Sequence, residues 1–135
     1  MKDTVVFSAL KNSGGYFDDG SYMTGYDKFL SNFEDAFDLS TGIFTAPKSG
    51  AYLFSASTTY SGSGEHYMSV EKNNQNMMHF YAYNKKGYDD DDALRFDFIL
   101  TLQKSDSVRL KIEKGNFGCS WRDACMFSGY FIRNT

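Results

Sequence analysis

The sequence contains one proline, two cysteines and no run of 18 apolar residues in a length of 135. A helix needs an apolar run of about that length to cross a membrane, so we expect no membrane insertion. The 14 basic residues are scattered, and with 17 acidic residues they give a formal net charge of −3. The sequence has no basic patch that would attract the phosphates of a nucleic acid, so we expect no nucleic-acid partner.

Catalytic motifs are also missing. The sequence has no GxSxG, no HExxH and no glycine-rich phosphate loop. His66 follows Gly62 and Gly64 in a polar segment that we expect to be a loop, and His79 lies in an aromatic strand where an outward or core position is expected. Adjacent carboxylates occur only in the acidic run Tyr88–Asp92, which is too polar for the separated pKa values that acid–base catalysis needs. The sequence therefore predicts that the protein is not an enzyme.

The two cysteines, Cys119 and Cys125, are six residues apart and flank the sequence SWRDA. In a hairpin, two such positions can face each other across the strands and form a disulfide. They can equally be free thiols that are partly buried, and the residues leave both alternatives open. A CxxC metal or redox motif is excluded, because the spacing is wrong and the chain has no further cysteine.

Aromatic residues are abundant, at 18% of the chain, with 13 Phe and 10 Tyr beside 12 Gly. Large rings suit the core of a β-sandwich, and glycines suit its turns. No linker or internal repeat divides the chain. At this length we expect a single domain over residues 1–135, because two cores would each bury too little surface.

Alternating segments predict one strand after another. The clearest is ALRFDFILTL, whose apolar face comprises Leu94, Phe96, Phe98, Leu100 and Leu102. Its other face carries Ile99 among polar residues, and a monomer would leave that face in water. The expected strands are Val5–Leu10, Tyr26–Ser31, Gly42–Thr45, Ala51–Tyr60, Tyr67–Lys72, Met77–Tyr83, Leu94–Leu102, Val108–Glu113 and Met126–Arg133.

Aromatic and turn residues recur at fixed intervals near the middle of the chain, at Asn32, Phe37, Phe44, Gly50, Tyr52 and Phe54. The segments DLSTG and APKSG between them are turns, and the second holds the only proline. This spacing resembles the globular head family of complement C1q, whose signature ends in Gly-x-Tyr-x-Phe. Tyr26 stands where that family usually has phenylalanine, a change that keeps a large ring.

The resemblance covers nearly the whole chain, because VVFSAL, LQKSDSVRLKIE and FSGY are similar to the first strand, the penultimate hairpin and the last strand of the family. It implies an all-β jelly-roll β-sandwich of about ten antiparallel strands, like C1q heads and tumour necrosis factor. The segment 29–37 also fits helical spacing, but it is short and the resemblance implies an extended conformation. We expect the core to include Phe44, Tyr52, Phe54 and Phe127.

The resemblance also implies a function. Members of this family are often secreted, extracellular homotrimers that bind glycans or other pathogen-associated surface ligands, as soluble pattern-recognition proteins and lectins of innate immunity. The alternative is a signalling ligand, adipokine-like or synaptic-organiser-like, that docks a protein receptor. A structural assembly unit is a third alternative. The first residues, MKDTVVFSALKN, lack the long apolar stretch of a secretory signal.

The acidic run Tyr88–Asp92 has two interpretations. It can be a solvated loop, as charge runs usually are. It can also bind calcium, because hard cations take carboxylate, amide and carbonyl oxygens and relieve the repulsion between adjacent carboxylates. Calcium-binding members of the family have ligands in this loop, and the resemblance places Asn84, Asp90, Asp91 and Asp92 there. Asn84 is a departure, because it is neutral where a carboxylate is expected.

The segment GNFGCSWRDAC contains the only tryptophan, Trp121, beside Arg122 and Asp123. An exposed indole beside a guanidinium can stack on a sugar, and Arg122 can pair with a carboxylate such as that of sialic acid. Alternatively, Trp121 packs under the loop as an apolar anchor. With Tyr88, these three residues form the predicted ligand site.

Overall fold

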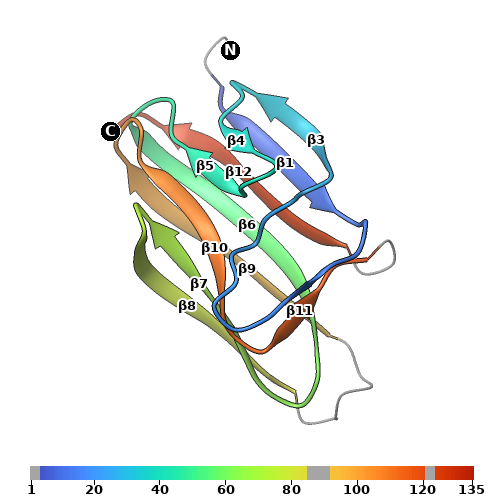
Figure 1. The fold of residues 1–135 in the computed structure, drawn as a ribbon. Helices are drawn as coiled ribbons and strands as arrows, with labels where there is room; N and C mark the ends of the chain where they lie inside the picture. Colours follow the sequence, from blue (N-terminus) through green and yellow to red (C-terminus); the bar gives the residue numbers. More distant parts are fainter. Residues whose placement is uncertain (1–3, 85–91, 121–123) are drawn as a thin grey trace.

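The computed structural model describes residues 4–84, 92–120 and 124–135, which form two antiparallel sheets (Figure 1). The strands are β1 (Val6–Lys11), β2 (Tyr16–Phe17), β3 (Lys28–Phe33), β4 (Phe37–Asp38), β5 (Ile43–Thr45), β6 (Gly50–Ser61), β7 (Gly64–Lys72), β8 (Gln75–Asn84), β9 (Asp92–Leu102), β10 (Ser107–Lys114), β11 (Asn116–Gly118) and β12 (Cys125–Arg133). The predicted jelly-roll β-sandwich is confirmed. In the described residues, no helix is long and apolar enough to cross a membrane.

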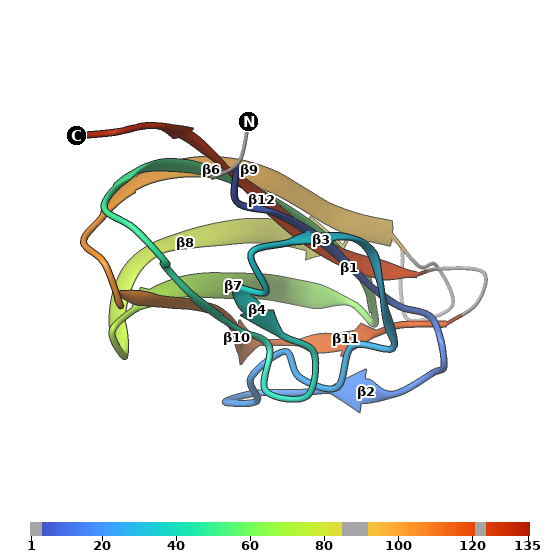
Figure 2. The same ribbon diagram turned by 90° about the horizontal axis from the view of Figure 1, so that it is seen from above.

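The sheets form two layers, which Figure 2 shows from above. The seven-stranded sheet has the order β2-β11-β6-β12-β1-β3, with β9 paired to β6, and the five-stranded sheet has the order β4-β5-β10-β7-β8. All nine predicted strands are present, although the strand expected at Tyr26–Ser31 lies at Lys28–Phe33. The short strands β2, β4 and β11 were not predicted.

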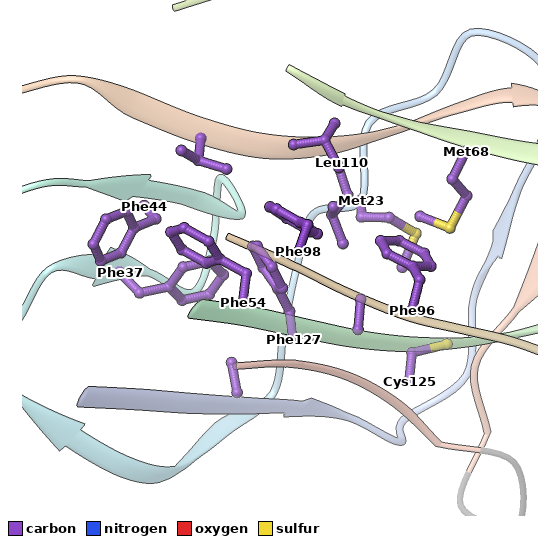
Figure 3. Close-up of a cluster of buried hydrophobic side chains, with 14 of the residues drawn as sticks. Met23, Phe37, Phe44, Phe54, Met68, Phe96, Phe98, Leu110, Cys125 and Phe127 are labelled. Atoms are coloured by element: carbon purple, nitrogen blue, oxygen red, sulfur yellow. The ribbon is translucent and has the colours of Figure 1, made fainter. Parts of the chain in front are cut away.

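Aromatic side chains fill the space between the layers (Figure 3). The ring of Phe54 lies 5.2 Å from Phe44, 5.2 Å from Phe98 and 5.9 Å from Phe127, measured between centroids. Rings in such offset and edge-to-face pairs stabilise a core beyond the area that they bury. The four residues predicted for the core are all buried, namely Phe44, Tyr52, Phe54 and Phe127.

This packing requires a glycine at position 129. A Cβ atom there would lie 2.7 Å from Cδ1 of Phe54 and 2.8 Å from Cε1 of Phe7, distances that real Cβ atoms do not reach. The DLSTG turn requires another glycine, since Gly42 has a φ of 72° and its N–H donates to the carbonyl of Asp38 at 2.8 Å. Close ring packing and tight turns therefore account for these two glycines.

The ambiguous segment 29–37 is not helical, in agreement with the resemblance, and it is extended except around Glu34 and Asp35. It contains the end of β3 and the start of β4, joined through Glu34 and Asp35, which have positive φ values of 73° and 49°. Phe37 is buried against Phe7, with the two rings stacked at 4.5 Å. The apolar residues that fit a helical spacing are therefore divided between a strand and the start of the next.

Candidate functional site

Different strand ends and turns lie at the two ends of the sandwich. The first residues of β6 lie beside the end of β12, where Ala51 is opposite Arg133, and β1 starts nearby, where Val6 is opposite Tyr130. The start of β1 and the end of β12 are therefore at one end (Figure 1). The last residue of β6, Ser61, lies at the other end beside β11. We call this the distal end.

Asn84, a predicted calcium ligand, lies at the distal end as the last residue of β8. It is buried and stands opposite Gly64 of β7. Its Nδ2 atom donates to the carbonyl of Gly62 at 2.8 Å, in the turn between β6 and β7. The side chain thereby fixes that turn, and its amide oxygen is the atom that could ligate a cation.

Asp92, the second predicted calcium ligand that the structure describes, is the first residue of β9. It is exposed and stands opposite Tyr60 of β6. Its Oδ1 atom accepts the N–H of Ala93 at 2.8 Å. Burial and the neighbouring Asp92 carboxylate together raise the pKa of Tyr60. Asn84 thus contacts the β6–β7 turn at Gly62, and Asp92 lies beside Tyr60 near the end of β6.

The remaining predicted site residues lie outside the described residues. They are Tyr88, Asp90, Asp91, Trp121, Arg122 and Asp123. Among residues 4–84, 92–120 and 124–135, no three His, Cys, Asp or Glu side chains are grouped so that they could hold a metal ion. The calcium site and the Trp121 site therefore stay predictions.

Cys119 and Cys125 form a disulfide, with their Cα atoms 5.3 Å apart. Of the two alternatives, the disulfide is therefore the correct one. The prediction that the two cysteines face each other in a hairpin was wrong, because β11 and β12 each pair with β6 rather than with each other. The disulfide closes the segment that joins two strands lying one after the other along β6.

His66 is buried within β7, and the prediction that it lies in a polar loop was wrong. Its ring lies 4.6 Å from that of Tyr60 and 5.8 Å from that of Phe117. Its Nε2 atom lies 2.7 Å from the carbonyl oxygen of Ser61 and its Nδ1 atom 3.1 Å from that of Gly64. These contacts give His66 a structural role in the distal end.

The sequence did not reveal a row of apolar residues that crosses the outer face of the seven-stranded sheet. The register places one residue from each of five neighbouring strands side by side, and we call them the apolar row: Phe33, Val6, Tyr130, Leu53 and Ile99. Phe33 and Ile99 are each 61% exposed. In the next row along the same strands, four serines, Ser31, Ser8, Ser128 and Ser55, lie beside the exposed Asp97 of β9.

A second exposed apolar surface lies on β8, the edge strand of the five-stranded sheet. We call it the β8 patch, and it comprises Tyr67, Met77, His79, Tyr81 and Tyr83. The ring of Tyr67 on β7 lies 5.7 Å from that of His79 and 6.0 Å from that of Tyr81. His79 thus takes the outward one of the two positions expected for it. Contiguous exposed apolar surfaces of this kind mark interaction sites.

The fold, the aromatic core and these surfaces define a C1q-type domain. A family model described as C1q domain matches residues 6–132, and the chain belongs to that family. The chain is 28% identical over 130 residues to caprin-2 of Danio rerio, covering 95% of this chain and 14% of that protein. It is 29% identical over 106 residues to complement C1q tumor necrosis factor-related protein 3 of Homo sapiens, covering 78% of this chain and 42% of that protein.

Solved structures agree on the fold. The globular domain of zebrafish complement 1qA protein superposes with a TM-score of 0.77 at 21% identity, covering 97% of this chain and 99% of the other. Murine APRIL superposes with a TM-score of 0.75 at 11% identity, covering 96% and 100% of the two chains. The Eiger TNF of S. frugiperda gives a TM-score of 0.72 at 10% identity, covering 97% and 95%. The chain spans less than half the length of the curated relatives it matches.

Proposed function

We propose that this chain is a secreted, homotrimeric recognition module that binds glycans or other repeated ligands on microbial surfaces. It acts by binding and not by catalysis. The observation that carries the proposal is the presence of two separate exposed apolar surfaces on one subunit, the apolar row and the β8 patch. A single subunit leaves both in water, and a ring of subunits covers both.

The two surfaces are suited to each other. The β8 patch lies on an edge strand and can approach a flat sheet, and the apolar row crosses such a sheet. The row beside it presents four serines, whose small side chains let a neighbouring edge come close, and the exposed Asp97 at its β9 end. Because the two surfaces differ, their contact is heterologous, and a heterologous contact that closes on itself gives a ring. Three subunits form the ring in this proposal.

Such a ring presents three distal ends in one direction, away from the start of β1 and the end of β12 (Figure 1). A weak site on each distal end gains avidity when several engage a repetitive surface at once. Glycan-rich surfaces are repetitive in this sense. The position of the disulfide-closed segment and of Asn84 and Asp92 at the same end supports the assignment of ligand recognition to it.

We propose in addition that calcium binds at the distal end, through Asn84 and Asp92 together with Asp90 and Asp91. Both described side chains offer oxygen ligands, which calcium prefers. Asn84 contacts Gly62 in the β6–β7 turn and Asp92 neighbours Tyr60 near the end of β6, so both lie at the distal end. An ion there would link the end of β8 to the start of β9.

A glycan array tests the recognition role against the signalling alternative. The trimeric protein is labelled and applied to a broad array of microbial and host glycans, and in parallel to intact cells followed by crosslinking. Saturable binding to a defined group of glycans is expected. If the protein binds no glycan on the array and captures a single membrane protein, the result would contradict glycan recognition and favour the receptor-binding alternative.

A further inference from the structure

A hollow of about 200 Å³ lies at the distal end, between β2 and the last residues of β6. Its lining includes Gly14, Gly15, Tyr16, Thr59, Ser61 and Ser120. Thr59 and Ser61 alternate with the buried Tyr60, so they belong to the outer face of the seven-stranded sheet. A hollow of this volume has room for one small ring.

Tyr16 forms one wall of the hollow, with 89% of its surface exposed. The backbone of Tyr16 is nevertheless fixed, because β2 pairs with β11 and places Tyr16 opposite Gly118. A Cβ atom on Gly118 would lie 3.3 Å from the tyrosine ring, so the missing side chain lets the ring lie close to the strand. The N–H of Cys119 also donates to the carbonyl of Gly15 at 3.2 Å. A large exposed ring is thus held on a rigid support.

The rest of the lining is polar and uncharged. Gly14 and Gly15 have φ values of 94° and 131°, which favour glycine and leave backbone at the surface of the hollow. Thr59, Ser61 and Ser120 contribute hydroxyl groups, which both donate and accept hydrogen bonds. Among the described residues that line the hollow, none is acidic or basic.

We infer that this hollow binds one ring of a neutral sugar, with the C–H face of the sugar against Tyr16. The inference rests on the proposed function and names the ligand class and the site. An aromatic face is electron-rich and attracts polarised C–H groups, while hydroxyl and backbone groups match the sugar hydroxyls. A phosphate or carboxylate would require a cationic partner, and an amine would require an anionic one. Among the described lining residues, none supplies either charge, and Lys11, whose Nζ lies near Gly15, already donates to the carbonyl of Gly25 at 2.7 Å.

The test compares three forms of the protein: wild type, Tyr16→Ala and Tyr16→Phe. Methyl glycosides of glucose, galactose, mannose and N-acetylglucosamine are titrated against each form and followed by NMR chemical shifts. We expect at least one glycoside to bind the wild type weakly. Tyr16→Ala lowers that affinity about ten-fold, because it removes the stacking surface. Tyr16→Phe keeps the ring and stays within about two-fold of wild type.

Because Tyr16 is exposed, we expect both variants to fold, and their melting temperatures check this. Equal binding of a neutral glycoside by wild type and Tyr16→Ala overturns the site but leaves glycan recognition intact. Binding restricted to charged glycans and unaffected by Tyr16→Ala does the same. Failure of the wild type to bind any glycan, on the array or in titration, overturns the site and the proposed function together.

Discussion

Phe54 lies where the rings from both sheets meet, in contact with Phe44, Phe98 and Phe127. Replacing it with alanine removes these contacts and leaves a cavity, so we expect Phe54→Ala to lower the free energy of unfolding by about 3–5 kcal/mol. Tyr16→Ala is the matched control, since that ring is almost wholly exposed and should change stability by less than about 0.5 kcal/mol. Urea denaturation measures both. Similar midpoints for the two variants would refute the central position of Phe54.

Asp106 gives a prediction about pH. Its carboxylate accepts Nδ2 of Asn73 at 2.9 Å and the N–H of Gln103 at 2.8 Å, and Lys72 lies 3.7 Å away. The hydrogen bond from Asn73, followed by that from Gln103, lowers the pKa of Asp106 from its ordinary value of 3.8.

Because the folded state holds the proton of Asp106 less tightly than the unfolded state, this stabilisation is present above pH 3.8 and is lost as the pH falls below it. We expect the melting temperature to fall with acidification in that range. Asp106→Asn, which removes the titrating group, should flatten part of the fall. Parallel melting curves for wild type and variant across the acid range would contradict this contribution.

Asp92 tests the calcium proposal. If calcium binds the folded protein through this carboxylate, calcium raises the melting temperature by mass action relative to chelator. Asp92→Ala should lose most of that increase, whereas Asp97→Ala, on the same strand and also exposed, should keep it. Thermal melting with calcium and with chelator gives the comparison. An equal response in Asp92→Ala would place the ion elsewhere, and no response in wild type would favour a solvated acidic loop.

At the scale of elements, the disulfide between Cys119 and Cys125 fixes the passage from β11 to β12. It closes a short loop with a sequence separation of six, and chain entropy gives such a closure roughly 2 kcal/mol of stabilisation. We expect the double variant Cys119→Ala, Cys125→Ala to lose up to about that amount in chemical denaturation. Reductant should destabilise wild type to a similar degree and leave the variant unaffected. A reductant effect in the variant would show that it acts on something other than this bond.

The strands that could be predicted are those whose own residues alternate. In β9 the apolar side chains at every second position fill the core, so pattern and structure coincide. β2, β4 and β11 have two or three residues each, which is too short for a period to appear. They exist because neighbours pair with them, as β11 pairs with both β2 and β6. His66 was misplaced for a related reason, since the glycines before it indicated a loop while the neighbouring rings of Tyr60 and Phe117 bury it.

The apolar row could not be predicted, because it depends on the register between five strands. Within β9, Ile99 was visible only as one apolar residue on a polar face. Ile99 is part of the apolar row only because strand pairing places Leu53 and Tyr130 beside it from distant parts of the sequence. The hollow beside Tyr16 is similar, because it depends on the pairing of β2 with β11. Asn84 and Asp92 could be named from the resemblance, but their contacts with Gly62 and Tyr60 needed the structure.

At the scale of the whole molecule, the proposed trimer explains why the two apolar surfaces are exposed on one subunit. Removing Ile99 and Phe33 from water favours association in proportion to the apolar area that becomes buried. A charge placed in the apolar row would be buried without a partner at the contact, which strongly opposes assembly. The same charge on an exposed residue away from both surfaces would not oppose assembly. The oligomeric state therefore tests directly whether the two apolar surfaces form the contacts between subunits.

Multi-angle light scattering at micromolar concentration is the most direct test of this account. The wild type should have a mass about three times 15.3 kDa. Ile99→Glu should give a folded monomer, while Thr45→Glu, exposed on the five-stranded sheet, should remain trimeric. A wild-type protein that is monomeric throughout this range, or an Ile99→Glu variant that stays fully trimeric, would contradict the proposal that the apolar row joins three subunits.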